Sequence, residues 1–289
     1  MIALIFWRIG FNISKNESAY IFCKSLKLNI DKVGVILRQT FFAIGFLLFV
    51  VALWGAVIGP LGLVSSARFP SPSETYEAFK LVLMQGYGNG LWHQHVFQSS
   101  MLVLISFAAS AGLGILLGIA MGSSRRVETF VNPVFLSLRP IPPLAWIPLA
   151  IVWFGLGNDA KVMVIFVAAF VPAVINTFTG VRSLEVSQRE AAEMLGISRK
   201  AYYLEVLIPA AMPMIFTGMR LSLQASWTTL VASELIGAML GLGSILNQAA
   251  QDINPPMILV GMISVALCGW LMTLMLSVLE RIAMPWRQA

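Results

Sequence analysis

The polar stretch Ser187-Gln-Arg-Glu-Ala-Ala-Glu-Met-Leu-Gly-Ile-Ser198 lies between two long apolar stretches, Lys161–Val181 and Met214–Ala238. Each apolar stretch has the roughly 20 residues that an α-helix needs to cross a bilayer. The connection between them, Arg182–Pro213, is long enough to hold structure of its own. The sequence therefore predicts a membrane protein with one structured polar segment between two membrane helices.

Within this segment the residues predict a helix, a bend and a second helix. Ser187, with Glu190 three residues later, has the form of a capping box, which marks a helix start. Gly196 is expected to end that helix in the left-handed conformation. Ser198 can cap a second helix, which is expected to stop before Pro209. Such a unit suits either a docking site for a partner protein or an amphipathic helix resting on the bilayer.

The composition places the whole chain in the membrane class. It is 58% hydrophobic and 11% charged, with a mean hydropathy of +0.84, whereas soluble domains carry about a quarter charged residues. The net charge of +6 comes from basic residues spread between apolar stretches, which favours a role in membrane topology over nucleic-acid binding. Neither Cys23 nor Cys268 has a metal-type spacing, so we expect no metal site and no disulfide framework.

Six membrane spans are predicted, and the positive charges orient them. The third is rich in proline and is expected to be kinked or broken. Sixteen of the nineteen basic residues fall on the side that holds both termini, which predicts that both termini are cytoplasmic. The spans are Thr40–Ile58, Gln98–Met121, Val131–Gly155, Lys161–Val181, Met214–Ala238 and Met257–Leu279.

The longest connector on the opposite side is Gly59–Phe97. Ser73 is expected to cap a helix that runs to about Met84 and lies flat on the outer membrane surface. His93 and His95 are one residue apart, without a third metal ligand in view. We therefore expect these two histidines to lie at the interface and not to bind a metal.

The second span carries a stripe of small residues at intervals of four. Small residues at this spacing form a groove in which another helix backbone can approach closely. The groove is expected to serve static helix packing, although a moving gate would use the same residues. The stripe consists of Ser106, Ser110, Gly114, Gly118 and Gly122.

The fifth span is the most polar. Arg220, Gln224, Trp227 and Glu234 share one helix face, which is expected to face protein or a water-filled pathway because polar groups facing lipid are costly. Arg220 and Glu234 are about 21 Å apart at 1.5 Å per residue, so these two can instead reach opposite interfaces. The hydroxyl residues of the nearly opposite face are expected to pack against a neighbouring helix.

The third span contains Arg139-Pro-Ile-Pro-Pro-Leu-Ala-Trp-Ile-Pro148. Prolines leave backbone carbonyls unpaired, and inside a membrane these are tolerated only where protein or a cavity satisfies them. Arg139, Pro142 and Trp146 are therefore candidates for lining a transport pathway. The alternative is an irregular helix start at the cytoplasmic surface.

The polar segment resembles a known motif. Glu190-Ala-Ala, then Gly196, then Val206-Leu-Ile-Pro209 resemble the EAA loop of ABC importer permeases, with conservative departures at Val206 and Ile208. In that family the loop forms a coupling helix that docks into a cleft on the ATPase subunit. The resemblance implies an all-α polytopic fold of the type I importer class. It also implies that the ATPase-coupling residues are Glu190, Ala191, Ala192, Gly196 and Pro209.

The resemblance runs from about Phe69 to Arg287 and points to the nitrate, sulfonate and taurine branch, with taurine permeases most similar. Besides the proline-rich stretch, it is carried by Trp153-Phe-Gly-Leu-Gly and by Trp227-Thr-Thr-Leu-Val-Ala-Ser-Glu-Leu-Ile-Gly. The expected organisation is a cytoplasmic segment 1–38, a first helix and outer loop 39–96, a permease domain 97–281 containing the loop 182–213, and a cytoplasmic tail 282–289.

The resemblance implies a transport subunit that is not itself an enzyme. No Gly-x-x-x-x-Gly-Lys-[Ser/Thr] stretch occurs, so ATP and Mg²⁺ are expected on a partner ATPase and no cofactor on this chain. The expected partners are two ATPase subunits, a second copy of the chain, an extracytoplasmic binding protein and the bilayer. The expected substrate is taurine or another sulfonate, with nitrate, bicarbonate or a pyrimidine precursor as alternatives.

Two other classes of function are weighed against this one. A secondary transporter or channel would normally carry ionisable relay groups or repeated halves, and only Glu234 is a candidate acid. A membrane enzyme would need a catalytic arrangement, and no Ser/His/Asp set stands out. Both classes are less well supported than the importer.

Overall fold

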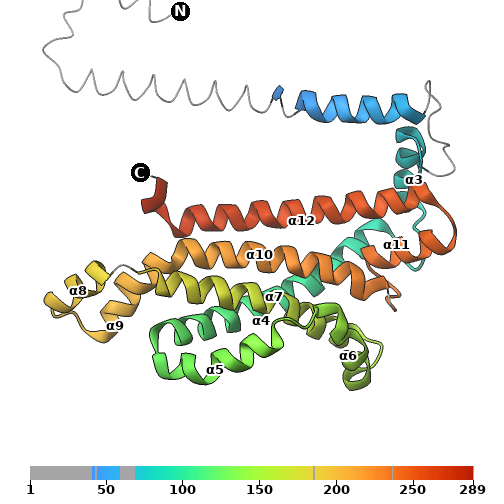
Figure 1. Cartoon of the computed structure of the whole chain (residues 1–289). Helices are drawn as coiled ribbons and strands as arrows, with labels where there is room; N and C mark the ends of the chain where they lie inside the picture. Colours follow the sequence, from blue (N-terminus) through green and yellow to red (C-terminus); the bar gives the residue numbers. More distant parts are fainter. Residues whose placement is uncertain (1–40, 43, 59–68, 185, 236, 289) are drawn as a thin grey trace, which may run out of the picture. The chain divides into compact units, whose positions relative to one another are not determined.

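The computed structural model describes residues 41–42, 44–58, 69–184, 186–235 and 237–288 (Figure 1). The chain divides into two units, Met1–Ser66 and Ala67–Ala289. In the first unit the apolar helix Ile44–Ile58 lies within the predicted first span, Thr40–Ile58, and ends at the same residue. The predicted cytoplasmic segment 1–38 lies outside the described residues.

The described part of the second unit is helical apart from its connecting loops and one isolated bridge between Tyr87 and Gly90, which confirms the all-α class. Helix α4 begins at Trp92 and α12 ends at Ala283, so the domain limits at 96/97 and 281/282 fall inside helices. The elements are α3 (Pro72–Met84), α4 (Trp92–Ser123), α5 (Arg125–Leu138), η2 (Pro143–Trp146), α6 (Ile147–Phe154), α7 (Asn158–Arg182), α8 (Val186–Met194), α9 (Arg199–Ala201), η3 (Tyr202–Leu207), α10 (Ile208–Leu235), α11 (Leu242–Gln251), α12 (Pro255–Ala283) and η4 (Pro285–Gln288).

Four helices within the described ranges are long and apolar enough to cross a membrane: α4, α7, α12 and the continuous helix Arg199–Leu235 that includes α10. The predicted third span, Val131–Gly155, is not one helix. It is split into α5 and the η2–α6 pair, which meet at 86°. Pro140, Pro142 and Pro143 account for the break, because proline lacks the N–H and clashes with the preceding turn.

Helices α4 and α7 pack at backbone distance along the stripe of small residues. A Cβ added at Gly114 would lie 2.6 Å from the Cβ of Ala173, and one at Gly118 would lie 2.6 Å from the Cβ of Thr177. Ser106 and Ser110, on the same stripe, are fully buried. The helix that occupies the predicted groove is therefore α7.

Helix α10 packs against the other side of α7, and α12 runs alongside α10 (Figure 1). A Cβ at Gly218 would lie 2.8 Å from the Cβ of Asn176. The Ser222 hydroxyl donates to the Ala169 carbonyl at 2.6 Å, so the hydroxyl face of α10 does pack against a neighbouring helix, as predicted. The α4–α7–α10 layer is the core that positions the remaining elements.

Helix α3 is capped by Ser71 and not by Ser73. The Ser71 hydroxyl accepts from Glu74 N at 3.3 Å, and Ser71 N donates to the Glu74 carboxylate at 2.7 Å, which completes a capping box. Pro72 occupies the first helical position, where its missing N–H costs nothing. The expected end of this helix at Met84 is confirmed.

Replacing Gly118 with leucine should separate α4 from α7, because the new side chain would meet both Thr177 and the Val174 carbonyl. Overpacking of this kind costs about 1–3 kcal/mol, so the melting temperature in detergent should fall. Gly112→Leu on the same helix is the matched control, since nothing lies within 4 Å of its Cβ position. Equal melting temperatures for the two variants would contradict the close packing.

Candidate functional site

The segment between α7 and α10 forms a short helix, a left-handed bend and a second helix. The predicted C-cap at Gly196 is confirmed: its φ is +61°, and its N–H donates to the Glu193 carbonyl at 3.0 Å. The Ser198 hydroxyl accepts from Ala201 N at 3.3 Å, so this predicted cap is also confirmed. The predicted cap at Ser187 is wrong, because α8 already begins at Val186.

The second helix does not stop before Pro209, as the sequence suggested. It passes through a π-helical turn, Tyr202–Leu207, and continues as α10. At this turn Ile208 N donates to the Tyr203 carbonyl, one residue further back than in an α-helix. The changed register accommodates Pro209, which has no N–H to contribute. The segment is thus continuous with a membrane helix.

The base of the segment is fixed to the bundle. Leu207 is buried with Val181 at the end of α7 and with Ala211 on α10, and Tyr202 packs against the same cluster. Beside it, the Arg182 guanidinium pairs with the Glu128 carboxylate at 2.8 Å, which ties the end of α7 to the start of α5. The helix α8 therefore projects from a firm base.

Helix α8 leaves an apolar tip exposed. Ala192 is buried, whereas Glu190 and Ala191 are exposed. Immediately before the bend, Met194 is 85% exposed and Leu195 is 78% exposed. Two adjacent large apolar side chains at the end of an otherwise polar segment are typical of a surface that a partner covers. Met194 and Leu195 belong to no motif in the sequence, although they directly precede the C-cap glycine.

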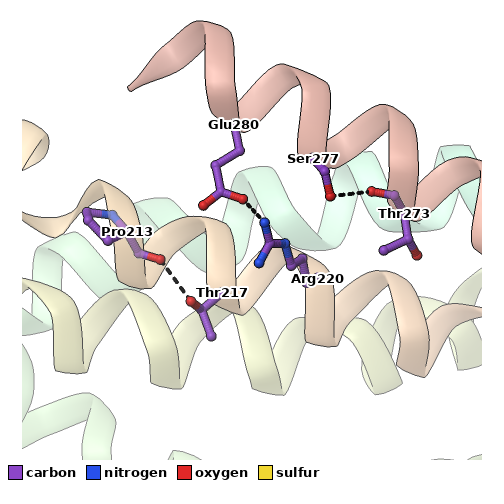
Figure 2. Close-up of polar contacts among 6 residues, drawn as sticks. All are labelled: Pro213, Thr217, Arg220, Thr273, Ser277 and Glu280. Carbon is purple, nitrogen blue, oxygen red and sulfur yellow. Dashed lines mark hydrogen bonds and ion pairs between the residues drawn. The ribbon is translucent and has the colours of Figure 1, made fainter. Parts of the chain in front are cut away.

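The four residues predicted to share one polar face of α10 have different surroundings in the structure. At one end, Arg220 forms an ion pair with Glu280 on α12, with the two side chains 44% and 12% exposed (Figure 2). In the same view the hydroxyl of Thr217 donates to the Pro213 carbonyl within its own helix. Glu280 was not among the predicted site residues, since nothing in the sequence places it opposite Arg220.

At the other end, Glu234 is fully buried within the bundle. Its carboxylate accepts from the Ser99 hydroxyl at 2.8 and 3.1 Å and from Gly243 N at 2.7 Å. The Ser99 hydroxyl in turn accepts from Leu242 N at 2.8 Å. A Cβ at Gly243 would lie 2.6 Å from the Cβ of Glu234. Glu234 therefore holds the start of α11 against α4 and α10.

Between these ends, Trp227 belongs to the main buried cluster, next to Gly269 of α12. Its indole N–H has no hydrogen-bond partner in the described part of the chain. Gln224 is exposed. Of the four stripe residues, only Gln224 and part of Arg220 are therefore accessible at the surface of the single chain.

His95 is buried within the fold. Its Nε2 lies 3.1 Å from the Tyr87 carbonyl and 3.2 Å from the Gly90 carbonyl, and its Nδ1 accepts from Gly241 N at 3.0 Å. The histidine thus joins two loops by backbone hydrogen bonds. No group of three or more His, Cys, Asp or Glu that could hold a metal occurs among the described residues.

A second contact joins the same loops. The Tyr87 hydroxyl donates to the Asp252 carboxylate at 2.5 Å. Burial, followed by the hydrogen bond to Asp252 and its negative charge, raises the pKa of Tyr87. The phenol therefore stays protonated and keeps donating at neutral pH. The loop 85–91 and α11 form one supported surface.

The proline-rich bend carries the remaining candidates. Arg139 caps the C-terminal end of α5 and is exposed, and Pro142 precedes η2. Arg139 lines two hollows between this region and α7, of about 250 and about 360 Å³. Trp146 lines the larger hollow, and its buried indole N–H has no partner within the described ranges. The structure brings Arg139 and Trp146 together, apart from the α10 stripe.

The family profile described as "Binding-protein-dependent transport system inner membrane component" matches residues 110–287. The taurine transport system permease protein of Escherichia coli (strain K12) is 35% identical over 250 residues, 86% of this chain and 90% of that protein. A putative aliphatic sulfonates transport permease protein of Bacillus subtilis (strain 168) is 35% identical, over 83% of this chain and 85% of that protein.

The nitrate import permease protein of Synechocystis sp. is 33% identical, over 77% of this chain and 82% of that protein. Among solved structures, an inward-facing form of the MetNI methionine ABC transporter matches with a TM-score of 0.53 and 19% identity. The match covers 63% of this chain and 93% of that chain. This last likeness concerns the fold alone.

Replacing Glu234 with alanine should loosen α11, because Gly243 N and the Ser99 hydroxyl would lose their buried acceptor. Each buried polar group left without a partner costs about 1–3 kcal/mol. Hydrogen–deuterium exchange of the Leu242 and Gly243 amides should become faster, and the melting temperature should fall. Leu235→Ala, at an exposed neighbouring position, is the control. Unchanged exchange at both amides in the Glu234→Ala variant would show that Glu234 does not hold the start of α11 in place.

Proposed function

Because the chain belongs to the family of binding-protein-dependent transport system inner membrane components, we propose that it is the permease subunit of an ATP-driven importer for taurine or another aliphatic sulfonate. The observation that carries the proposal is the projecting helix α8, with its left-handed bend at Gly196 and its exposed apolar tip. A permease of this family needs such a surface, since it has no ATPase site of its own.

In the proposed assembly, α8 is the coupling helix that docks on an ATPase subunit. Glu190, Ala191, Ala192 and Gly196 are its coupling residues, and Met194 and Leu195 are apolar anchors for the docking contact. ATP and Mg²⁺ bind the two ATPase subunits. Both termini of the permease are cytoplasmic, in the bacterial inner membrane, as the distribution of positive charge favours.

Transport proceeds by alternating access. Two copies of the chain enclose one pathway, and closure of the ATPase subunits on ATP opens that pathway to the outside. An extracytoplasmic binding protein, the partner that the family description names, delivers the substrate there. Because a ligand shifts an equilibrium only through its different affinity for the two states, ATP must favour the outward-open arrangement.

The proposed substrate class rests on the relatives. The names of the similar permeases refer to taurine, aliphatic sulfonates, nitrate and bicarbonate. Sulfonates, nitrate and bicarbonate share a small negatively charged group rich in oxygen, and taurine carries a sulfonate. Nitrate, bicarbonate or a pyrimidine precursor remain alternatives within the same importer type, and the ligand of the binding protein decides among them.

Uptake should depend on ATP hydrolysis by the partner. The complete importer, reconstituted in proteoliposomes with its binding protein, should take up taurine with the normal ATPase. A partner carrying an inactivated ATPase site should reduce uptake to background, because the pathway could no longer alternate. Uptake that persisted with the inactive partner would point to a secondary transporter or channel.

Replacing Met194 and Leu195 together with serine should weaken assembly with the ATPase, because both exposed side chains would lose apolar contact area. Less ATPase should co-purify per permease, and uptake should fall in proportion. The matched control is Met239→Ser, at an 81% exposed methionine between α10 and α11. If the double variant retained as much ATPase as the control, α8 would not be the docking element.

A further inference from the structure

The two arginines that the sequence places in the pathway differ in their surroundings. Arg220 is paired with Glu280, so its charge is balanced inside the chain. None of the carboxylates in the described ranges forms an ion pair with Arg139. The structure therefore separates a structural arginine from one that is available to a ligand.

Arg139 also lies far along its helix. It follows the 14 residues of α5, which rise about 21 Å from Arg125 at 1.5 Å per residue. An arginine at that distance along a membrane-embedded hairpin is costly when it faces lipid, and such residues usually face a cavity or a partner group. The two hollows beside Arg139 provide that cavity.

The larger hollow has the composition of a small-ligand site. Its volume of about 360 Å³ falls within the roughly 300–1,000 Å³ of such sites. Arg139 supplies the charge, and the stacked rings of Phe166 and Phe170, with centroids 5.4 Å apart, supply apolar wall. Trp146 also lines the hollow and extends its aromatic wall.

We propose that the hollow formed by Arg139, Trp146 and the Phe166–Phe170 pair holds the transported solute, with the Arg139 guanidinium bound to its sulfonate or equivalent oxyanion. The planar guanidinium donates two parallel hydrogen bonds to such a group. The aromatic wall, to which the Trp146 side chain belongs, covers the short carbon chain. This inference rests on the proposed function and names the residues that recognise its substrate class.

Two other occupants have related chemistry. A lipid phosphate would also pair with Arg139, and so would a carboxylate from a second copy of the chain. A lipid in the hollow would exclude water-soluble reagents, and a carboxylate would cancel the positive charge. Both are separable from substrate by experiment.

The first experiment uses the complete importer in proteoliposomes. Arg139→Gln should lower taurine uptake about tenfold or more, the effect of losing a charge-assisted contact, while the binding protein still stimulates ATP hydrolysis. Arg139→Lys, which keeps the charge, should recover part of the uptake. Arg126→Gln, at an exposed arginine in the first turn of the same helix, should behave like the parent.

The second experiment measures the charge in the hollow without transport. Leu138→Cys, at a residue lining the hollow, is placed in the full chain with Cys23→Ser and Cys268→Ala. A sulfonate-bearing methanethiosulfonate should label this thiol faster than its ammonium-bearing analogue. Adding Arg139→Gln should lower that ratio about fivefold, the effect in water of one charge about 8 Å away that attracts one reagent and repels the other.

The inference is overturned if Arg139→Gln transports like the parent, or if the glutamine and lysine variants are equally impaired. It is also overturned if Leu138→Cys is not labelled from water, as a lipid in the hollow would cause, or if the anionic reagent has no advantage, as a carboxylate would cause. A parent complex without ATP-driven uptake would instead overturn the proposed function, before any variant is compared.

Discussion

The close approach of α4, α7 and α10 is the constraint on which the other parts of the second unit depend. Gly114 and Gly118 on α4 and Gly218 on α10 leave no space for a Cβ against α7, so the three backbones are held at a fixed separation. In a bilayer there is little hydrophobic drive between helices, and such contacts must come from van der Waals packing. Helix α7 packs against both α4 and α10, and its last residue, Arg182, pairs with Glu128 of α5 just before the segment that leads to α8.

Three charged side chains in or beside the membrane helices have partners within the chain. Arg220 has Glu280, Glu234 has Ser99 and Gly243, and Arg182 has Glu128. For Arg220 and Glu234, which lie within a membrane helix, such partners offset the cost of a polar group in the bilayer. None of the ion pairs among the described residues includes Arg139, which lines the hollows beside α7, and this is the basis for assigning it a ligand from outside the chain. Pairing, and not polarity alone, separates structural from functional residues here.

Much of this fold can be predicted from the sequence, because hydropathy, glycine spacing and helix caps are local signals. The stripe from Ser106 to Gly118, the left-handed Gly196 and the cap at Ser198 are examples. The break in the third span was anticipated from its prolines, but the 86° angle was not, because it depends on packing against α7. The π-helical turn before Pro209 was missed because the sequence signal of a proline is the same whether a helix ends or changes register.

The partners of the charged residues on the membrane helices could not be predicted from the sequence either. Nothing local connects Glu280 to Arg220 or Ser99 to Glu234, because these pairs join residues far apart in the chain.

The packing of the helices offers a mechanical route in the proposed importer. Helix α8 leads through the π-helical turn into α10, which packs on α7, and α7 forms a wall of the hollow beside Arg139. A displacement of α8 by a bound ATPase would therefore act on that wall through packed helices, because close-packed protein interiors transmit strain.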